Sequence, residues 1–142
     1  MAELRPARPG ELSQVRALWE RCFGDDPRYI SGFLSHFSAP EQLPVLAVDG
    51  KVRSMCCLLP TTLELNGAEH PAAYVYAMST DPDFQGQGYG LRFLEQLRGY
   101  ARGLGYHLIT LMPADEGLFR FYEKGGYETA FQCRHLAVSK AD

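Results

Sequence analysis

The stretch with the clearest chemical potential is the glycine-rich sequence TDPDFQGQGYGL at residues 80–91. Three of its residues are glycines at alternate positions, which leaves the backbone nearly bare, so that a ligand can approach its amide groups closely. An apolar run at 73–78 precedes the stretch and an amphipathic run at 89–104 follows it, which predicts a strand, a tight loop and a helix. The first N–H groups of a helix lack partners and lie at its positive dipole end. We therefore expect an anion to bind there, and a phosphate group is the anion that we expect first.

The spacing of the glycines decides between the known phosphate loops. A dinucleotide-binding loop, G-x-G-x-x-G, that started at Gly86 would need a glycine where the chain has Leu91. A P-loop would need a lysine after the glycines, and none follows. The pattern that fits is Gln/Arg-x-x-Gly-x-Gly/Ala, here QGQGYG at residues 85–90. The alternative is a glycine turn that binds no ligand.

Composition limits the classes of protein that need to be considered. The chain has 142 residues and a net charge of -3, so we expect one domain over 1–142, with no nucleic acid and no membrane among its partners. Its apolar runs are too short to span a bilayer, and the start of the sequence has no apolar signal segment. The four cysteines show no metal-ligand spacing, so we expect no metal, and reduced thiols predict a cytoplasmic protein.

The remaining periodicities predict a mixed α/β fold. Apolar residues at helical spacing predict helices at 11–23 and 28–37, and the second of these carries an aromatic row. Asp49-Gly50 and Asn66-Gly67 are hairpin signals that link three antiparallel strands leading into the glycine loop. The other predicted elements are a short strand at 3–7, a buried strand at 107–112, a helix that starts at 113–115 and ends at Gly125-Gly126, and two last strands at 127–131 and 133–138.

This element order, together with two local motifs, resembles the GCN5-related N-acetyltransferases, the GNAT family. The sequence QGQGYG is similar to the family's pyrophosphate-binding loop, and FYEKGGY at residues 121–127 is similar to the segment that ends its last core helix. The resemblance covers the chain from end to end. It implies a mostly antiparallel sheet of about six to seven strands with three to four helices and a central parallel pair whose strands splay beside a β-bulge near Met78 and Ser79.

The resemblance also implies a cosubstrate, acetyl-CoA, and a set of residues for it. Backbone groups of Met78 and Thr80 would pair with the pantetheine arm, and the amides of 85–90 would hold the pyrophosphate. Tyr122 occupies the family's general-acid position, with a packing tyrosine as the alternative. The implied cofactor-binding residues are Met78, Ser79, Thr80, Gln85, Gly86, Gln87, Gly88, Tyr89, Gly90 and Asp115.

Two positions depart from the family pattern, and one role is left open. Asp115 stands where the family often has asparagine, which puts its cofactor contact in doubt but not its helix cap. Gln85 replaces the commoner arginine and removes a positive charge from the loop. The Met78 amide is our candidate for stabilising charge on the thioester carbonyl oxygen. The general base is undetermined, and the candidates by residue type are Glu64, His70, Tyr74, Tyr76 and His107.

The sequence therefore predicts an N-acetyltransferase that transfers an acetyl group from acetyl-CoA directly to a primary amine of a small molecule or peptide. Asp25-Asp26 suggests a cationic acceptor, although a solvated loop explains this pair equally well. A homodimer is an open alternative for the assembly. The competing function is a non-catalytic domain that binds or senses acetyl-CoA, and an NAD-binding domain is disfavoured by the glycine spacing.

Overall fold

The computed structural model describes residues 3–36 and 39–131. The chain falls into two compact units, Met1–Met112 and Pro113–Asp142. The strands are β1 (Glu3–Pro6), β2 (Pro44–Val48), β3 (Lys51–Leu65), β4 (Ala68–Thr80) and β5 (Leu108–Thr110). The helices are η1 (Pro9–Glu11), α1 (Leu12–Phe23), α2 (Pro27–Ser35), η2 (Pro40–Gln42), η3 (Pro82–Phe84), α3 (Tyr89–Gly103) and α4 (Glu116–Lys124), where η marks a 3-10 turn.

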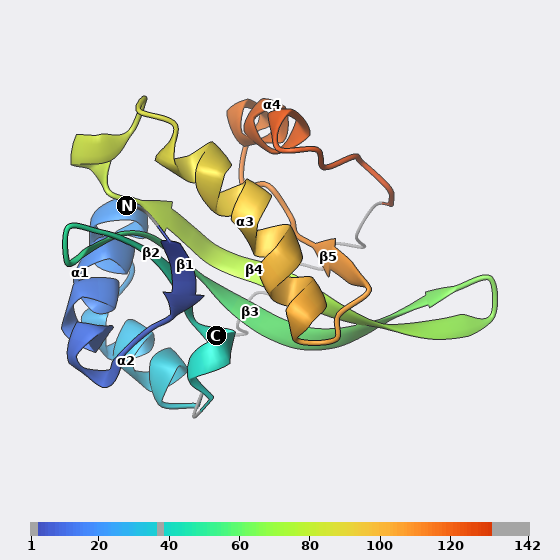
Figure 1. Cartoon of the computed structure of the whole chain (residues 1–142), viewed down its shortest axis with the longest axis horizontal. Coiled ribbons are helices and arrows are strands. Elements are labelled where there is room, and N and C mark those ends of the chain that lie inside the picture. Colours follow the sequence, from blue (N-terminus) through green and yellow to red (C-terminus); the bar gives the residue numbers. More distant parts are fainter. Residues whose placement is uncertain (1–2, 37–38, 132–142) are drawn as a thin grey trace, which may run out of the picture. The chain divides into compact units, whose positions relative to one another are not determined.

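The first unit is built on one mixed sheet with the strand order β1-β2-β3-β4-β5 (Figure 1). Neighbouring strands are antiparallel except for β4 and β5, which are parallel. Both predicted hairpins are present, because Asp49-Gly50 and Asn66-Gly67 each place two consecutive residues at positive φ, the conformation of a type I′ turn. The first turn joins β2 to β3 and the second joins β3 to β4.

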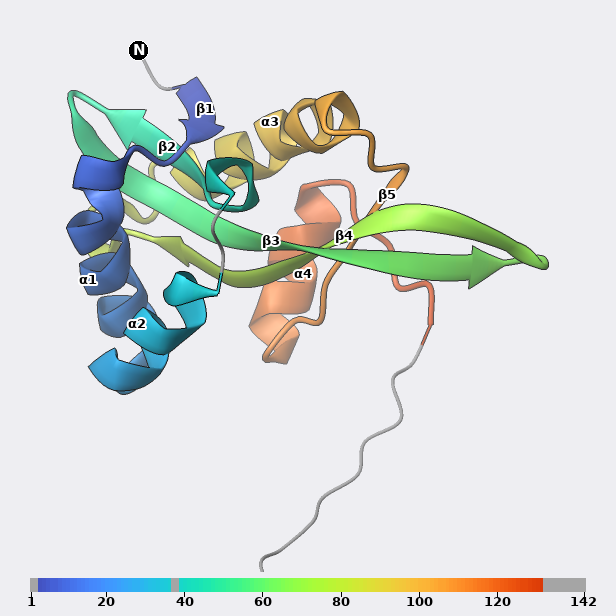
Figure 2. The same cartoon turned by 90° about the horizontal axis from the view of Figure 1, so that it is seen from below.

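Helices cover both faces of this sheet, and each face has its own core (Figure 2). On one face, α1 and α2 bury a cluster that includes Val15, Trp19 and Ile30 against β3 and β4. On the other face, α3 buries Phe93 and Leu97 in a second cluster. The sheet thus holds α1 and α3 on opposite sides of β4, the strand that leads into the glycine loop.

The predicted fold class is confirmed as a mixed, mostly antiparallel sheet with one parallel pair and four α-helices, but the described residues contain five strands rather than six to seven. Residues 127–131 were predicted as a strand and are not one, because no described strand pairs with them and a strand needs a hydrogen-bonded neighbour. The predicted strand at 133–138 lies outside the described residues. None of the helices within 3–36 and 39–131 is both long and apolar enough to cross a bilayer.

The described part of the second unit is built around α4. Asp115 begins the helix as its N-cap, since its carboxylate accepts a hydrogen bond from the Leu118 amide at 2.9 Å. The helix ends at the predicted place, where the Gly125 amide donates to the Phe121 carbonyl. The rings of Phe121, Tyr122 and Tyr127 then pack in a row at centroid distances of 5.2 and 5.7 Å.

Candidate cofactor site

The strands β4 and β5 pair only over a short stretch. Their register runs from Ala72 opposite Leu108 to Tyr74 opposite Thr110, whereas β4 continues to Thr80. Among the described strands, none pairs with β4 on this side beyond Tyr74. We call this side of β4 its open edge, meaning only that no described strand pairs with it; the Thr80 carbonyl at its end already accepts hydrogen bonds from other residues. An open strand edge can bind an extended amide-containing chain by adding it as a further strand. This is the geometry that the resemblance implied for a pantetheine arm.

A β-bulge lies in the same part of β4. The pairing with β3 passes from Tyr76 opposite Cys57 to Ser79 opposite Met55, so Ala77 and Met78 together face Cys56. Ala77 has a φ of +55°, a left-handed conformation that is unfavourable for alanine, and the Ser79 hydroxyl donates a hydrogen bond to its carbonyl at 3.0 Å. The predicted bulge near Met78 and Ser79 is therefore present, and it interrupts the pairing with β3, which resumes at Ser79 and Thr80.

The glycine loop joins this strand end to α3. Gly86 and Gly88 have φ values of +80° and +82°, and a Cβ atom at either residue would have no heavy atom within 4 Å. Glycine is required here for the backbone conformation, and the surrounding space is open. By geometric criteria, no amide N–H from Gln85 to Leu91 donates to any described residue, and the first N–H of the helix with a partner belongs to Arg92.

These amides are suited to bind a pyrophosphate, the group that the sequence predicted for this loop. The last four of them lie at the N-terminus of a 15-residue helix, where the dipole favours an anion. The preceding amides extend the row of donors along the loop. The glycine positions leave room beside the backbone, so the loop could hold a pyrophosphate through its main chain alone.

The side chains of the loop do not complete this cradle. The Gln85 side chain turns back to β4, where its Nε2 donates to the Thr80 carbonyl at 3.3 Å. Tyr89 packs its ring on Phe84, with centroids 5.8 Å apart. The Thr80 carbonyl also accepts a contact from the Cys22 thiol at 3.4 Å, and the Thr80 hydroxyl pairs with that of Ser54. Gln85 thus acts on the shape of the loop rather than as a substitute for the positive charge of an arginine.

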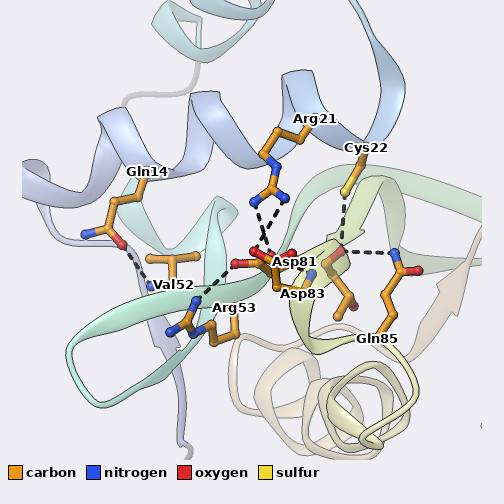
Figure 3. Close-up of polar contacts among 9 residues, drawn as sticks. Gln14, Arg21, Cys22, Val52, Arg53, Asp81, Asp83 and Gln85 are labelled. Carbon is orange, nitrogen blue, oxygen red and sulfur yellow. Dashed lines mark hydrogen bonds and ion pairs between the residues drawn. The ribbon is translucent and has the colours of Figure 1, made fainter.

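Sequence reasoning missed an ionic cluster at the start of the loop (Figure 3). The buried carboxylate of Asp81 accepts hydrogen bonds from Arg53 at 3.0 Å, from Arg21 at 3.2 Å and from the Asp83 amide at 3.0 Å. Burial alone would raise the pKa of Asp81, but the Asp83 amide and the two guanidinium groups outweigh it, so the pKa lies below its usual value. The available signal was Asp81-Pro82, because Asp before Pro is a typical start of a helical turn.

The second unit carries the two remaining predicted residues. Tyr122 is partly exposed on α4, and its carbonyl accepts a hydrogen bond from the Tyr127 amide at 3.0 Å. The Asp115 carboxylate is engaged in the helix cap. The cap predicted for Asp115 is confirmed, whereas its cofactor contact and the acid role of Tyr122 stay predictions.

The structure separates the candidates for a general base. His70 and His107 lie together with their Nδ1 atoms 3.5 Å apart, at the end of the β4–β5 pair where the two strands begin to pair, whereas the open edge lies at the other end. The Tyr76 hydroxyl is 2.8 Å from that of Tyr29, and this hydrogen bond, with burial, raises the Tyr76 pKa. A phenol with a raised pKa stays protonated at neutral pH, which makes Tyr76 a poor base.

The acidic pair suggested for a cationic acceptor has structural partners. Asp25 accepts a hydrogen bond from the Trp19 indole at 2.9 Å, and Asp26 caps α2 by accepting from the Arg28 amide at 2.8 Å. Both carboxylates therefore stabilise the α1–α2 connection. This leaves the pair as weak support for a cationic substrate.

Comparisons with known proteins agree with this geometry. The family model of the acetyltransferase (GNAT) domain matches residues 3–130. The N-alpha-acetyltransferase RimI of Mycobacterium tuberculosis is 27% identical to this chain over 150 residues, which cover 99% of the chain and 91% of that protein.

Solved structures of acetyltransferases also superpose on this chain. A putative acetyltransferase from Agrobacterium tumefaciens superposes with a TM-score of 0.71 at 25% identity, covering 94% of this chain and 99% of that one. The aminoglycoside N-acetyltransferase AAC(6')-Iy, solved in complex with CoA, has a TM-score of 0.79 over 97% of this chain and 95% of its own. At 12% identity, this second likeness shows the fold alone.

The splayed strand pair and the glycine loop at a helix N-terminus define an acetyltransferase fold. The chain belongs to the acetyltransferase (GNAT) domain family, and within that family it is an N-acetyltransferase.

Proposed function

We propose that this protein binds acetyl-CoA in the glycine loop and along β4 and transfers the acetyl group directly to a primary amine of a small molecule or peptide. The observation that carries the proposal is the row of amides from Gln85 to Leu91, which make no hydrogen bond to described residues and follow the end of β4 in the chain. Such a row suits a pyrophosphate, and the strand edge suits an amide-containing arm. Acetyl-CoA, when bound, supplies the activated acetyl thioester.

The residues of the chain would contribute to the transfer in two ways. A donor at the bulge, for which the Met78 amide is our candidate, would stabilise the charge that develops on the thioester carbonyl oxygen. The Tyr122 phenol, at the family's general-acid position, would give a proton to the departing thiolate sulfur. The amine must reach the site as the neutral base, and with Tyr76 protonated we propose that its proton leaves through water.

We infer the class of acceptor from two similar proteins, because the name of each states the kind of amine that it acetylates. One relative is named as an N-alpha-acetyltransferase and one structural neighbour as an aminoglycoside N-acetyltransferase. Both names describe transfer to an amine, which is why we propose a primary amine. A cytoplasmic location goes with this proposal, and the described cysteines Cys22, Cys56 and Cys57 are free thiols, as a reducing compartment favours.

The experiment is a thiol-release assay of the purified chain with acetyl-CoA and a panel of amines. The panel contains peptides with free N-termini, the same peptides with blocked N-termini and a lysine side chain, and an aminoglycoside. We expect release that depends on one class of amine. Thermal stabilisation by CoA with no turnover on any amine would instead support a sensing domain, and stabilisation by NAD would contradict the cofactor assignment.

A further inference from the structure

The backbone of the glycine loop has few hydrogen bonds of its own, and the side-chain contact of Gln85 with the Thr80 carbonyl holds only its first residue. Its amides from Gln85 to Leu91 have no partner among the described residues, and Gly86 and Gly88 have positive φ values with no heavy atom within 4 Å of a Cβ position. A cradle of amides binds an anion well only when the amides already point the right way, because ordering a loose loop costs conformational entropy. The direction of the amides must therefore be set where the loop leaves β4 and where it enters α3.

Asp81 is the residue at which the loop leaves β4, and contacts surround it. Its side chain is buried, and it receives one donor from α1, one from β3 and one from its own turn, namely Arg21, Arg53 and the Asp83 amide (Figure 3). Its backbone is held as well, because its amide donates to the Arg53 carbonyl at 2.7 Å and its carbonyl accepts from the Phe84 amide at 2.8 Å. One carboxylate thus joins three separate elements.

Arg53 extends this connection toward the helix end of the loop. The central carbon of its guanidinium group lies 3.6 Å above the Phe84 ring, and Phe84 in turn packs on Tyr89, the first residue of α3. The Nε atom of Arg53 is buried without a partner in the described part of the chain, so the guanidinium is held by Asp81 and by the ring. The cluster therefore holds Asp81, where the chain leaves β4, and reaches the first residue of α3 through the Phe84 ring.

On the basis of the proposed function, we propose that Asp81, held by Arg53 and Arg21, is a positioning residue for the pyrophosphate-binding loop. The turn at Pro82–Phe84 needs only a capping oxygen, which asparagine would supply equally well. Two arginines directed at one buried oxygen pair favour a carboxylate, because its charge-assisted hydrogen bonds to guanidinium groups are roughly twice as strong as those of a neutral acceptor. The charge of Asp81 thus fixes the loop on β3 and α1, beyond what the local turn requires.

The test is Asp81→Asn in the full chain, with affinity for CoA measured by isothermal titration calorimetry. Asparagine keeps the cap and the shape but removes the charge. We expect the Kd for CoA to rise by roughly ten- to a hundredfold, the scale of a small misplacement of a binding group. In steady-state kinetics we expect the KM for acetyl-CoA to rise while kcat at saturation stays near that of the wild type.

A matched control is available elsewhere in the chain. Glu11 is likewise a buried carboxylate in a 3-10 turn, and it accepts hydrogen bonds from the Arg5 guanidinium and from the Arg8 amide. It does not contact the glycine loop. Glu11→Gln should lower the melting temperature, as we also expect for Asp81→Asn, but should leave the Kd for CoA unchanged.

A shortened ligand separates positioning from a general loss of structure. S-acetylpantetheine lacks the pyrophosphate, so its KM should be the same for Asp81→Asn and the wild type. An equal loss with both ligands, or an unchanged Kd for CoA, would overturn the inference.

If Asp81→Asn does not fold, the variant Arg21→Gln provides the test, because this arginine side chain is 49% exposed. Weaker CoA binding by Arg21→Gln would support the inference, and wild-type binding would overturn it. Failure of the wild type to bind CoA would instead refute the proposed function itself.

Discussion

At the scale of single residues, Tyr122 can serve both packing and chemistry. Its ring lies between those of Phe121 and Tyr127, which is the packing role that its helical spacing predicted. Its side chain is nevertheless partly exposed. Removing only the hydroxyl therefore separates the two roles.

For Tyr122→Phe, we expect turnover to fall by roughly ten- to a thousandfold, the scale of losing one general acid, with CoA affinity little changed. The ring contacts are retained, so the melting temperature should stay close to that of the wild type. Steady-state rates and CoA titration measure the two quantities. Tyr100→Phe is the control, since it removes a phenol on α3 that donates to the Glu41 carbonyl in η2, and it should leave turnover intact. Wild-type turnover in Tyr122→Phe would restrict Tyr122 to packing.

At the scale of elements, β4, the loop and α3 form one functional unit. The strand supplies an open edge, the loop supplies free amides, and the helix supplies a dipole. The glycines are what allow the amides to be exposed. A side chain at such a position disturbs the cradle even though it meets no other atom.

Gly88→Glu should abolish detectable CoA binding, because it places a carboxylate in the anion cradle. Gly67→Glu is the matched control, since Gly67 has a similar φ, +79°, and a Cβ there also meets nothing within 4 Å. Both substitutions should cost about 1–2 kcal/mol of stability for the left-handed conformation. Calorimetric titration and thermal unfolding check the pair. CoA binding by Gly88→Glu with wild-type affinity would refute the assignment of the loop.

The local elements could be predicted from the sequence because their signals are local. Asp49-Gly50 and Asn66-Gly67 fix hairpin turns through two residues each, and QGQGYG identifies the loop. The Asp81 cluster could not be predicted in this way, because Arg53 and Arg21 lie 28 and 60 residues away in sequence. The strand predicted at 127–131 was wrong for a related reason: the local sequence does not reveal whether a partner strand lies beside it, and none of the described strands does.

At the scale of the whole molecule, buried ion pairs link stability to pH. The Arg5 guanidinium binds Glu11 through two contacts of 2.8 Å, and it is the main cause that lowers the pKa of Glu11 to about 2. An unfolded glutamate titrates near its usual value of 4.5. The Arg5–Glu11 ion pair therefore contributes fully to the free energy of unfolding above pH 4.5. This contribution is lost as the pH falls from about 4.5 toward 2.

Glu11→Gln should remove the contribution of this ion pair to the free energy of unfolding, which is on the order of 2 to 3 kcal/mol at neutral pH. Urea unfolding at a series of pH values measures it. The difference in unfolding free energy between the wild type and Glu11→Gln should be largest above pH 4.5 and should shrink toward pH 2. A difference that is independent of pH would contradict the ion pair as its source.

The central claim is that free backbone amides at the start of α3 bind the pyrophosphate of acetyl-CoA. The most direct test is calorimetric titration of the wild-type chain with acetyl-CoA and with S-acetylpantetheine, which lacks that group. Two charge-assisted hydrogen bonds at about 1.5 kcal/mol each predict that acetyl-CoA binds roughly a hundredfold more tightly. Equal affinity for the two ligands, or no binding of acetyl-CoA, would contradict the account.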